Sequence, residues 1–392
     1  MADAGIRTGV AIAVDDGRFV AVGAIGEVER GRGNFEYIDC AGRVVTPGLV
    51  DSHTHAVFGR PRYEEQELRA AGAGYMEIAQ KGGGIHSSVR DLRMRSEDDL
   101  LALARARLRR LARYGATTIE IKSGYGLSVE DELKSLRVIS RLKTETSLRL
   151  VPTWLGAHEI PLEYRDRRDG RREYVEQLLL EQLPAVVREQ LATFADVFCE
   201  PGVFTLEETR TILKASRARG LMLKLHADEL EPSGGAELAA ELGAISADHL
   251  AAISGAGIKA LADSGTVATL LPGTMFFLGR ARQAPARALI EAGAVVALAT
   301  DFNPGTSPTP NLPLVMTVGV SQLHMSVAEV LLATTVNGAA ALGLAESTGQ
   351  IAPGFSADVA LWDCEDVREI PYWYGDARCV ASWCCGEPVH SV

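Results

Sequence analysis

The sequence places two histidines, His53 and His55, directly after the apolar run VTPGLVD (45–51). Alternate residues of an extended segment project to the same side, so both imidazoles can bind one metal ion. A single His-x-His pair is a weak signal by itself. A metal site therefore requires further ligands at comparable places in the chain.

Three such candidates end other apolar runs: His226 in KLHADE, His249 in SADHL and Asp301 in ALATD. The chain has only eight histidines, so four at such positions favour one shared site over separate structural roles. Imidazoles together with a carboxylate suit zinc or iron(II), and spacing does not distinguish these metals. A metal so held lowers the pKa of bound water and makes hydroxide available at neutral pH.

Hydrolysis also needs a group that moves protons. Glu229 and His249 are the candidates, because a carboxyl or imidazole group in a partly desolvated site can titrate near the working pH. The alternative for Glu229 is an acid at a helix N-terminus that interacts with the helix dipole. Three histidines lack a comparable placement, and we expect them to be structural: His86, His324 and His390.

The elements that must position these residues follow from eight apolar runs separated by helical, charge-bearing segments, a pattern typical of parallel βα units. The runs are 45–51, 117–121, 148–153, 195–200, 222–227, 244–250, 266–271 and 295–301. Eight parallel strands close a (β/α)₈ TIM-type barrel, whose active site lies at the C-terminal ends of the strands. Asp51, His53 and His55 fall at the end of the first strand. A helix is expected after the last one, over 326–342.

The two ends of the chain predict a second, smaller unit. Residues 8–23 alternate as two strands, GVAIAV and RFVAVG, around a turn at 15–17. The segment GQIAPGFSADVALWD near the other end returns to strand-like alternation. The sequence therefore predicts a small β domain built from 1–45 and 346–392, beside a barrel of 46–345.

Composition limits the classes of partner. The net charge of -11 and the pI of about 5.3 argue against nucleic acid and favour a small-molecule substrate. We expect the arginines of the helical stretch 105–113 to form a solvated face. The chain shows no leader-like segment and no apolar run of about 18 residues, so we expect a cytoplasmic location and no membrane partner. Six cysteines without a CxxC pair indicate reduced thiols.

Several motifs together resemble the imidazolonepropionases of the amidohydrolase superfamily. They are TPGLVDSHTHAVFGRPRYEEQELR (46–69), KSGYGL (122–127), TWLGAHEIP (153–161), DVFCEPGVF (196–204), KLHADEL (224–230), SADHL (246–250) and ATDFNPGTSPTPN (299–311). The resemblance runs from about residue 8 to about residue 375, and family members carry one further strand before it. It implies hydrolysis of 4-imidazolone-5-propanoate to N-formimidoyl-L-glutamate in histidine degradation, by a homodimer.

The resemblance also implies roles for individual residues. The metal, zinc or iron, would be bound by His53, His55, His226 and Asp301, and the catalytic acid and base would be Glu229 and His249. The substrate contacts would be Arg62, Tyr75, Tyr125, His158, Glu229, Asn303, Gly305 and Thr306.

The role implied for Arg62 is chemically reasonable, because a guanidinium can grip a propionate tail with two donors. The alternative is a loop salt bridge with Glu64 or Glu65. Two other functions stay open: an aminohydrolase acting on a purine or pyrimidine, and a non-catalytic relative of the barrel. Arg62 and KSGYGL argue against the first, and the complete ligand set argues against the second.

Overall fold

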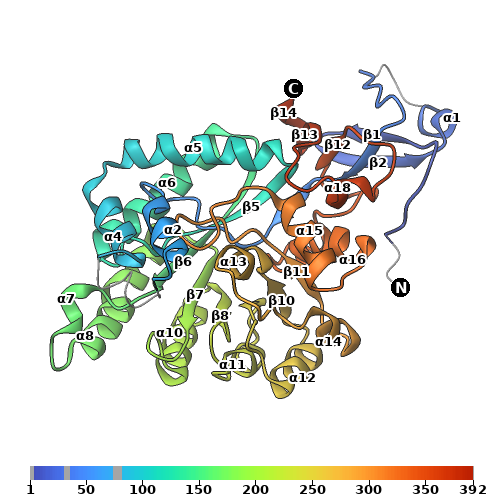
Figure 1. Ribbon diagram of the computed structural model, residues 1–392. Coiled ribbons are helices and arrows are strands. Elements are labelled where there is room, and N and C mark those ends of the chain that lie inside the picture. Colours follow the sequence, from blue (N-terminus) through green and yellow to red (C-terminus); the bar gives the residue numbers. More distant parts are fainter. Residues whose placement is uncertain (1–3, 31–35, 74–81, 392) are drawn as a thin grey trace.

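The computed structural model describes residues 4–30, 36–73 and 82–391, and its centre is a parallel β-barrel (Figure 1). The strands pair in the order of the sequence, β4 to β11. They are β4 (Leu49–Asp51), β5 (Ala116–Lys122), β6 (Arg149–Ala157), β7 (Phe194–Cys199), β8 (Met222–Ala227), β9 (Ser246–His249), β10 (Val267–Leu270) and β11 (Val296–Leu298). All eight predicted runs contribute a strand to this barrel.

The first and last strands meet just beyond their ends. The backbone N–H of His55 donates to the carbonyl of Phe302 (2.9 Å), and that of Asp301 donates to the carbonyl of His53 (3.0 Å). An isolated parallel bridge joins Thr54 to Phe302. The barrel therefore closes at the segments that carry the predicted metal ligands.

Helices surround the barrel, and several begin at side-chain caps that the sequence supplies. Ser96, Thr205 and Ser326 each accept a hydrogen bond from the backbone N–H three residues later, and an acid there bonds back. Within the described residues the helices, of which α1 packs on the N-terminal strands, are α1 (Ile25–Val28), α2 (Tyr63–Ala70), α4 (Ile85–Met94), α5 (Glu97–Arg113), α6 (Val129–Glu145), α7 (Leu162–Arg165), α8 (Gly170–Gln177), α9 (Leu183–Arg188), α10 (Leu206–Arg217), α11 (Gly235–Glu241), α12 (Gly255–Ser264), α13 (Pro272–Phe277), α14 (Ala286–Glu291), α15 (Leu312–Gln322), α16 (Val327–Ala333), α17 (Val336–Ala340) and α18 (Glu369–Tyr372), with a π-helical turn at Leu178–Gln182.

Two predicted elements differ in the structure. The run 45–51 divides into β3 (Val44–Pro47), which belongs to another sheet, and the barrel strand β4. The helix expected over 326–342 divides into α16 and α17. Thr334 and Thr335 lie at the break, where their hydroxyls donate to the carbonyl of Leu331 (3.2 and 2.7 Å) and compete with the helical pattern.

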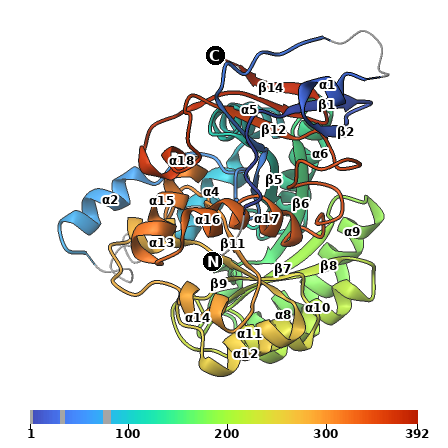
Figure 2. The same ribbon diagram turned by 90° about the vertical axis from the view of Figure 1, so that its right-hand side faces the viewer.

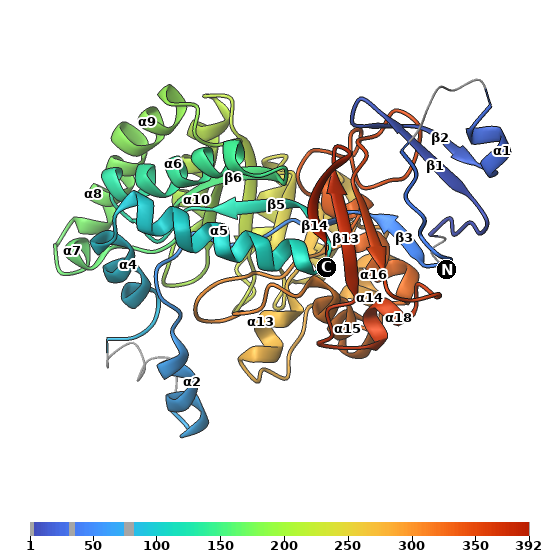
Figure 3. The same cartoon turned by 90° about the horizontal axis from the view of Figure 1, so that it is seen from above.

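The N- and C-terminal segments together form a small antiparallel unit, as predicted. β3 pairs with β12 (Val359–Trp362), and β13 (Cys379–Cys384) and β14 (Glu387–Ser391) follow. Figure 3 shows the red β13 and β14 near the blue β3. The domain boundaries at 45/46 and 345/346 stay a prediction.

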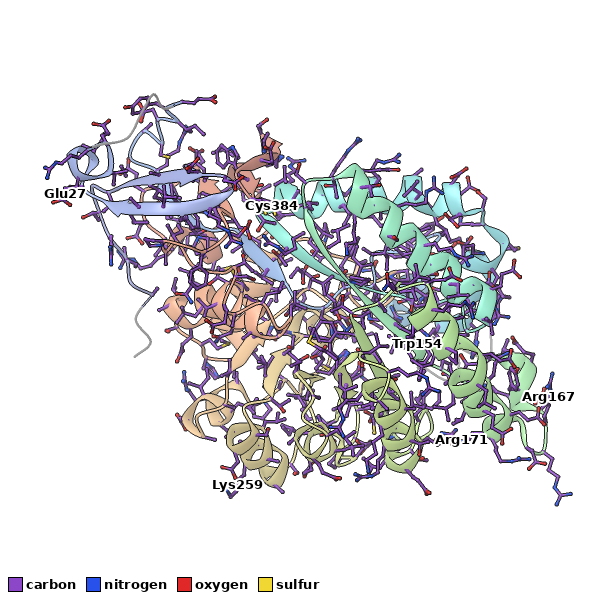
Figure 4. The ribbon with its side chains drawn as sticks, turned by 180° about the vertical axis from the view of Figure 1, so that it is seen from behind. Glu27, Trp154, Arg167, Arg171, Lys259 and Cys384 are labelled. Carbon is purple, nitrogen blue, oxygen red and sulfur yellow. The ribbon has the colours of Figure 1, made fainter. Side chains whose placement is uncertain are left out.

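The predicted N-terminal hairpin is also present, as β1 (Ala11–Asp15) and β2 (Arg18–Gly23). It forms a two-stranded sheet of its own next to the red C-terminal strands (Figure 2). The backbone N–H of Phe19 donates to the carbonyl of Phe355 (2.9 Å), and Gly354 donates back to Phe19 (2.8 Å). In Figure 4, Cys384 lies where this unit meets the barrel, far from Arg167 at the other end of the molecule.

Among the described residues, no helix is long and apolar enough to cross a membrane. All six cysteines are free thiols, as the spacing predicted.

Candidate metal centre and active site

The structure brings the four predicted metal ligands together at the C-terminal end of the barrel. Ligand atoms of His53, His55 and His226 lie within 4.8 Å of one another, as do those of His53, His249 and Asp301. Oδ1 of Asp301 lies 3.5 Å from Nε2 of His53 and 3.4 Å from Nε2 of His55. All of these side chains are buried. The four predicted ligands come from three strand ends, and His249 joins them from a fourth.

The backbone is strained where these side chains emerge. Asp301 has a φ of 51° and His249 a φ of 79°, both in the left-handed region that non-glycine residues rarely adopt. Such conformations cost about 1–3 kcal/mol each and persist where the surrounding structure enforces them. Here the strain turns both side chains toward the cluster.

The cluster fits a metal ion on its own chemistry. Nε2 of His53 and Nε2 of His226 are buried and have no hydrogen-bond partner within the described part of the chain. Burial lowers the pKa of His55 and of His226, which keeps both imidazoles neutral and able to bind a metal. Burial alone would raise the pKa of Asp301, but the neighbouring His53 and His55 hold it well below 3.8. Burial also favours the neutral form of His53, but the carboxylates of Asp248 and Asp301 outweigh it and raise the pKa of His53 to about 9, so His53 must release a proton to bind a metal. The set offers three imidazoles and a carboxylate to one cation.

Two buried aspartates contact the Nδ1 atoms of two of these histidines. Nδ1 of His53 lies 2.6 Å from Oδ2 of Asp248, and Nδ1 of His226 lies 2.9 Å from Oδ2 of Asp196. The carboxylate of Asp248 hydrogen-bonds to Nδ1 of His53 and so directs its Nε2 to the cluster, whereas Asp196 pairs with His226 by proximity. The sequence-based prediction did not include either aspartate.

The aspartates belong to a layer of charged groups inside the barrel. Nζ of Lys122 lies 2.8 Å from both Oε1 of Glu120 and Oδ2 of Asp196, and 3.7 Å from Oδ2 of Asp248. Nζ of Lys224 is also 3.7 Å from Asp248. None of these side chains is exposed, and buried charges need such partners. The layer fixes the base of the metal centre.

Two threonines hold the carboxylates of the first and last strands. Thr274 at the start of α13 donates to Oδ2 of Asp301 (2.6 Å), which leaves Oδ1 to the cluster. Thr300 donates to Asp51 through its N–H (3.0 Å) and hydroxyl (2.7 Å). Burial raises the pKa of Asp51 to about 7. Asp51, which was expected at the strand end, therefore closes the barrel and lies outside the ligand cluster.

The predicted proton-transfer pair is in contact. Oε2 of Glu229 lies 3.5 Å from Nδ1 of His249, and burial raises the pKa of Glu229. Glu229 does not begin a helix, because α11 starts at Gly235. The acid at that helix start is Asp228, which accepts from the N–H of Ala236 (2.9 Å). The alternative role for Glu229 is thus filled by its neighbour.

A further carboxylate holds the loop that carries Glu229. Glu200 accepts hydrogen bonds from the backbone N–H groups of Glu229 (3.1 Å), Leu230 (3.2 Å) and Glu231 (2.7 Å). Burial raises the pKa of Glu200 to about 7. Three donors on one carboxylate fix the direction of the loop.

Tyr125 and His158 form one wall of the site. The ring of His158 stacks on His55 with centroids 5.2 Å apart, and Tyr125 is 5.8 Å from the same ring. Nδ1 of His158 lies 2.9 Å from the carbonyl of Gly124, and burial lowers its pKa to about 3. His158 is therefore neutral, and its Nε2 is free to accept a hydrogen bond. Glu132 fixes this loop by accepting from the N–H groups of 124, 126 and 127.

The predicted substrate loop packs against Arg62. Arg62 donates its backbone N–H to Pro304 (2.9 Å) and Nη1 to Ser88 (3.1 Å). Oδ1 of Asn303 accepts from the N–H groups of Gly305 and Thr306, both at 2.8 Å. Asn303 thus shapes the loop. Tyr75 lies outside the described residues.

The salt bridge expected as the alternative role of Arg62 is present as well, since its Nε lies 3.2 Å from Oε1 of Glu65.

The prediction of a solvated arginine face over 105–113 is wrong at Arg107, which is buried. Arg107 donates to the carbonyls of Ala56 (3.1 Å), Phe58 and Gly59 (2.6 Å), and stacks on the Phe58 ring. It therefore supports the segment that follows His55.

Comparison with known proteins gives the same family as the sequence motifs. Residues 61–390 match the amidohydrolase family. The chain is 48% identical over 375 residues to the imidazolonepropionase of Bacillus velezensis, covering 96% of this chain and 88% of that one. It is also 48% identical over 380 residues to the imidazolonepropionase of Symbiobacterium thermophilum, with the same two coverages.

Solved structures share the fold at low sequence identity. A zinc-bound adenosine deaminase from Xanthomonas campestris superposes with a TM-score of 0.71 at 16% identity, covering 97% of this chain and 88% of that one. A 5-methylcytosine deaminase from Klebsiella pneumoniae has a TM-score of 0.73 at 19% identity, with coverages of 98% and 95%. The fold, the convergent histidines and aspartate, and the full-length relatives agree: the chain belongs to the imidazolonepropionase family of the amidohydrolases.

Proposed function

We propose that this protein hydrolyses the ring amide of 4-imidazolone-5-propanoate and releases N-formimidoyl-L-glutamate. The observation that carries the proposal is the convergence of His53, His55 and His226 on one point. Asp301 lies beside His53 and His55, and the loop at Gly305 packs against the guanidinium of Arg62. Two relatives that are 48% identical to this chain are named imidazolonepropionase, and this name supports the imidazolone as the substrate.

Three side chains would bind the substrate. The guanidinium of Arg62 pairs with the propionate, since it can donate two parallel hydrogen bonds to a carboxylate. Tyr125 supplies a phenolic donor beside it. Nε2 of His158 accepts a hydrogen bond from a ring N–H, because its Nδ1 is engaged by the carbonyl of Gly124.

Glu229 and His249 would carry the proton transfers. Water adds to the ring carbonyl carbon, the C–N bond breaks, and the departing nitrogen gains a proton. Glu229 accepts the proton from the attacking water and delivers it to that nitrogen, because burial raises its pKa toward the range of a useful base. His249, 3.5 Å away, stabilises the negative charge that develops on the carbonyl oxygen.

The metal would be held by His53, His55, His226 and Asp301, and it would be zinc or iron. When bound, such an ion polarises the carbonyl and lowers the pKa of water. The buried set of three imidazoles and one carboxylate supports a divalent cation. We also propose that the protein acts in the cytoplasm as a homodimer on a small-molecule substrate and binds no nucleic acid.

The test is direct. The imidazolone is generated in place with a urocanate-hydrating enzyme, and its ultraviolet absorbance is followed with and without this protein, while bound metal is measured on the same sample. Loss of absorbance that depends on the metal supports the proposal. Release of ammonia from guanine or cytosine, with no consumption of the imidazolone, would replace it with an aminohydrolase function.

A further inference from the structure

The buried carboxylate of Glu65, which the proposed mechanism does not use, contacts three residues around the proposed substrate-binding guanidinium. Oε1 of Glu65 accepts the backbone N–H of Gly84 (2.6 Å) and lies 3.2 Å from Nε of Arg62. Oε2 accepts Nη2 of Arg69 (3.0 Å). The Glu65 side chain is only 6% exposed. Glu65 therefore joins helix α2 to the loop before α4 and contacts the guanidinium that would bind substrate.

The guanidinium of Arg62 also lies against Gly305. A Cβ at residue 305 would overlap the guanidinium group of Arg62. Gly305 does not have a left-handed φ, so its backbone would accept alanine and the glycine serves only to leave space. Nη1 of Arg69 also donates to the carbonyl of Gly305 (3.2 Å). Glu65 and Gly305 thus both contact Arg62, and Arg69 hydrogen-bonds to both of them.

This arrangement decides which part of Arg62 faces a ligand. A guanidinium presents two pairs of parallel donors, one that includes Nε and one formed by the terminal nitrogens. Glu65 lies at Nε and Ser88 accepts one hydrogen of Nη1 (3.1 Å), so the remaining hydrogens of the two terminal nitrogens are left for a ligand carboxylate. Holding a long side chain in place before binding also reduces the entropy that binding must overcome.

We propose that Glu65 and Gly305 are positioning residues that make this entrance selective for small heterocycles with a carboxylate tail. Glu65 attracts the guanidinium by ion pairing at its Nε end, 3.2 Å away, and Gly305 gives it room to lie flat. Both residues act through Arg62 in this role, which for Gly305 is additional to the substrate contact that the resemblance implies. The inference rests on the proposed function, because it assumes a substrate that carries a carboxylate.

The experiment compares Glu65→Gln and Gly305→Ala with two matched controls in the metal-loaded enzyme. Glu64→Gln makes the same change at an exposed neighbour that pairs with Arg60, and Gly255→Ala adds a methyl group in open space. Two competitive ligands are used, imidazole-4-propionate and 4-propylimidazole, which differ in the carboxylate. Bound metal and thermal unfolding are measured for every variant.

In Glu65→Gln and Gly305→Ala, the guanidinium of Arg62 is no longer held in place for its charge-assisted contact with the ligand carboxylate. The affinity for imidazole-4-propionate should therefore fall, and KM should rise, by about tenfold or more. The affinity for 4-propylimidazole should stay within about twofold and kcat within about threefold, since the ring contacts are unchanged. Both controls should behave as the parent enzyme. Adding Glu65→Gln to Arg62→Ala should cause little further loss, because the effect passes through Arg62.

Equal weakening of both ligands, or no weakening of either, would overturn the inference. If Glu65→Gln fails to fold, Gly305→Ala decides alone. A parent enzyme that does not consume the imidazolone, yet shows the carboxylate-dependent contrast, would refute the proposed function and leave the positioning role intact. A parent enzyme with full turnover and no contrast would refute only the positioning role.

Discussion

Nδ1 of His53 lies 2.6 Å from Oδ2 of Asp248, and neither side chain is exposed to solvent. The pair fixes one nitrogen of a proposed metal ligand, so that the other points to Oδ1 of Asp301 at 3.5 Å. Asp248 is itself held by the hydroxyl of Ser246 (2.6 Å) and by the nearby ammonium groups of Lys122 and Lys224. The direction of the metal ligand is thus set inside the barrel.

Asp248→Asn tests this relationship. The amide is uncharged and can donate where the carboxylate only accepts, so His53 loses the partner that keeps its proton on Nδ1. Replacing such a partner typically weakens metal binding by about 10–100-fold. Titration of the metal-free protein with zinc against a competing chelator measures this loss. Asp263→Asn, at an exposed aspartate paired with Lys259, is the control and should bind zinc like the parent.

Glu229→Gln separates proton transfer from metal binding. The glutamine keeps the size of the side chain but cannot accept a proton, so kcat/KM should fall by about 10²–10⁴-fold. Zinc or iron content should be unchanged, because Glu229 contacts His249 and not the three other histidines of the cluster. Steady-state kinetics and metal analysis on the same preparation give both values. Near-normal turnover with full metal content would assign the proton transfer to another group.

Much of the fold follows from the sequence because the barrel strands are short apolar runs between amphipathic helices. The metal ligands were predictable for the same reason: His53, His226 and Asp301 each come at the end of such a run. The break between α16 and α17 was not predictable from apolar periodicity, which continues through it. It depends on how Thr334 and Thr335 bond to the preceding turn.

The supporting residues were missed because their partners are distant in the sequence. Asp196 and Lys122 are separated by 74 positions, and Asp248 and His53 by 195. A signal was nevertheless present. Polar residues alternate within otherwise apolar strands, as in Glu120 and Lys122, and alternate positions of a barrel strand share the interior face.

Lys122→Met tests whether the buried charges act as a unit. Removing the ammonium group leaves Glu120 and Asp196 without their shared partner, and breaking a buried ion pair in this way costs about 3–5 kcal/mol. Urea unfolding should show a loss of this size. Lys134→Met, at a partly exposed pair with Asp131, should cost about 1 kcal/mol or less. Adding Glu120→Gln to Lys122→Met should recover part of the loss, and its failure to do so would argue against a coupled network.

Asp358 joins the small β domain to the barrel and gives a prediction for acid stability. Its carboxylate pairs with Arg149 on β6 and accepts from the N–H of Cys385 (2.8 Å), close to the position of Cys384 in Figure 4. Burial alone would raise the pKa of Asp358, but Arg149 and Thr348 hold it below 3.8. Because the folded-state pKa is the lower one, the stabilisation is present above about pH 4 and is lost as the pH falls through the folded-state value.

Asp358→Asn should therefore reduce the free energy of unfolding by about 3 kcal/mol at neutral pH, since it leaves Arg149 without its partner. The difference from the parent should be constant between about pH 5 and 7. It should shrink below about pH 4, where the unfolded parent begins to take up a proton at this carboxyl group while the folded carboxylate stays charged to lower pH. Urea unfolding across this range measures the difference, with Asp363→Asn, at an exposed aspartate, as the control. A difference that stays constant below pH 4 would mean that packing, and not the charge of Asp358, holds the two units together.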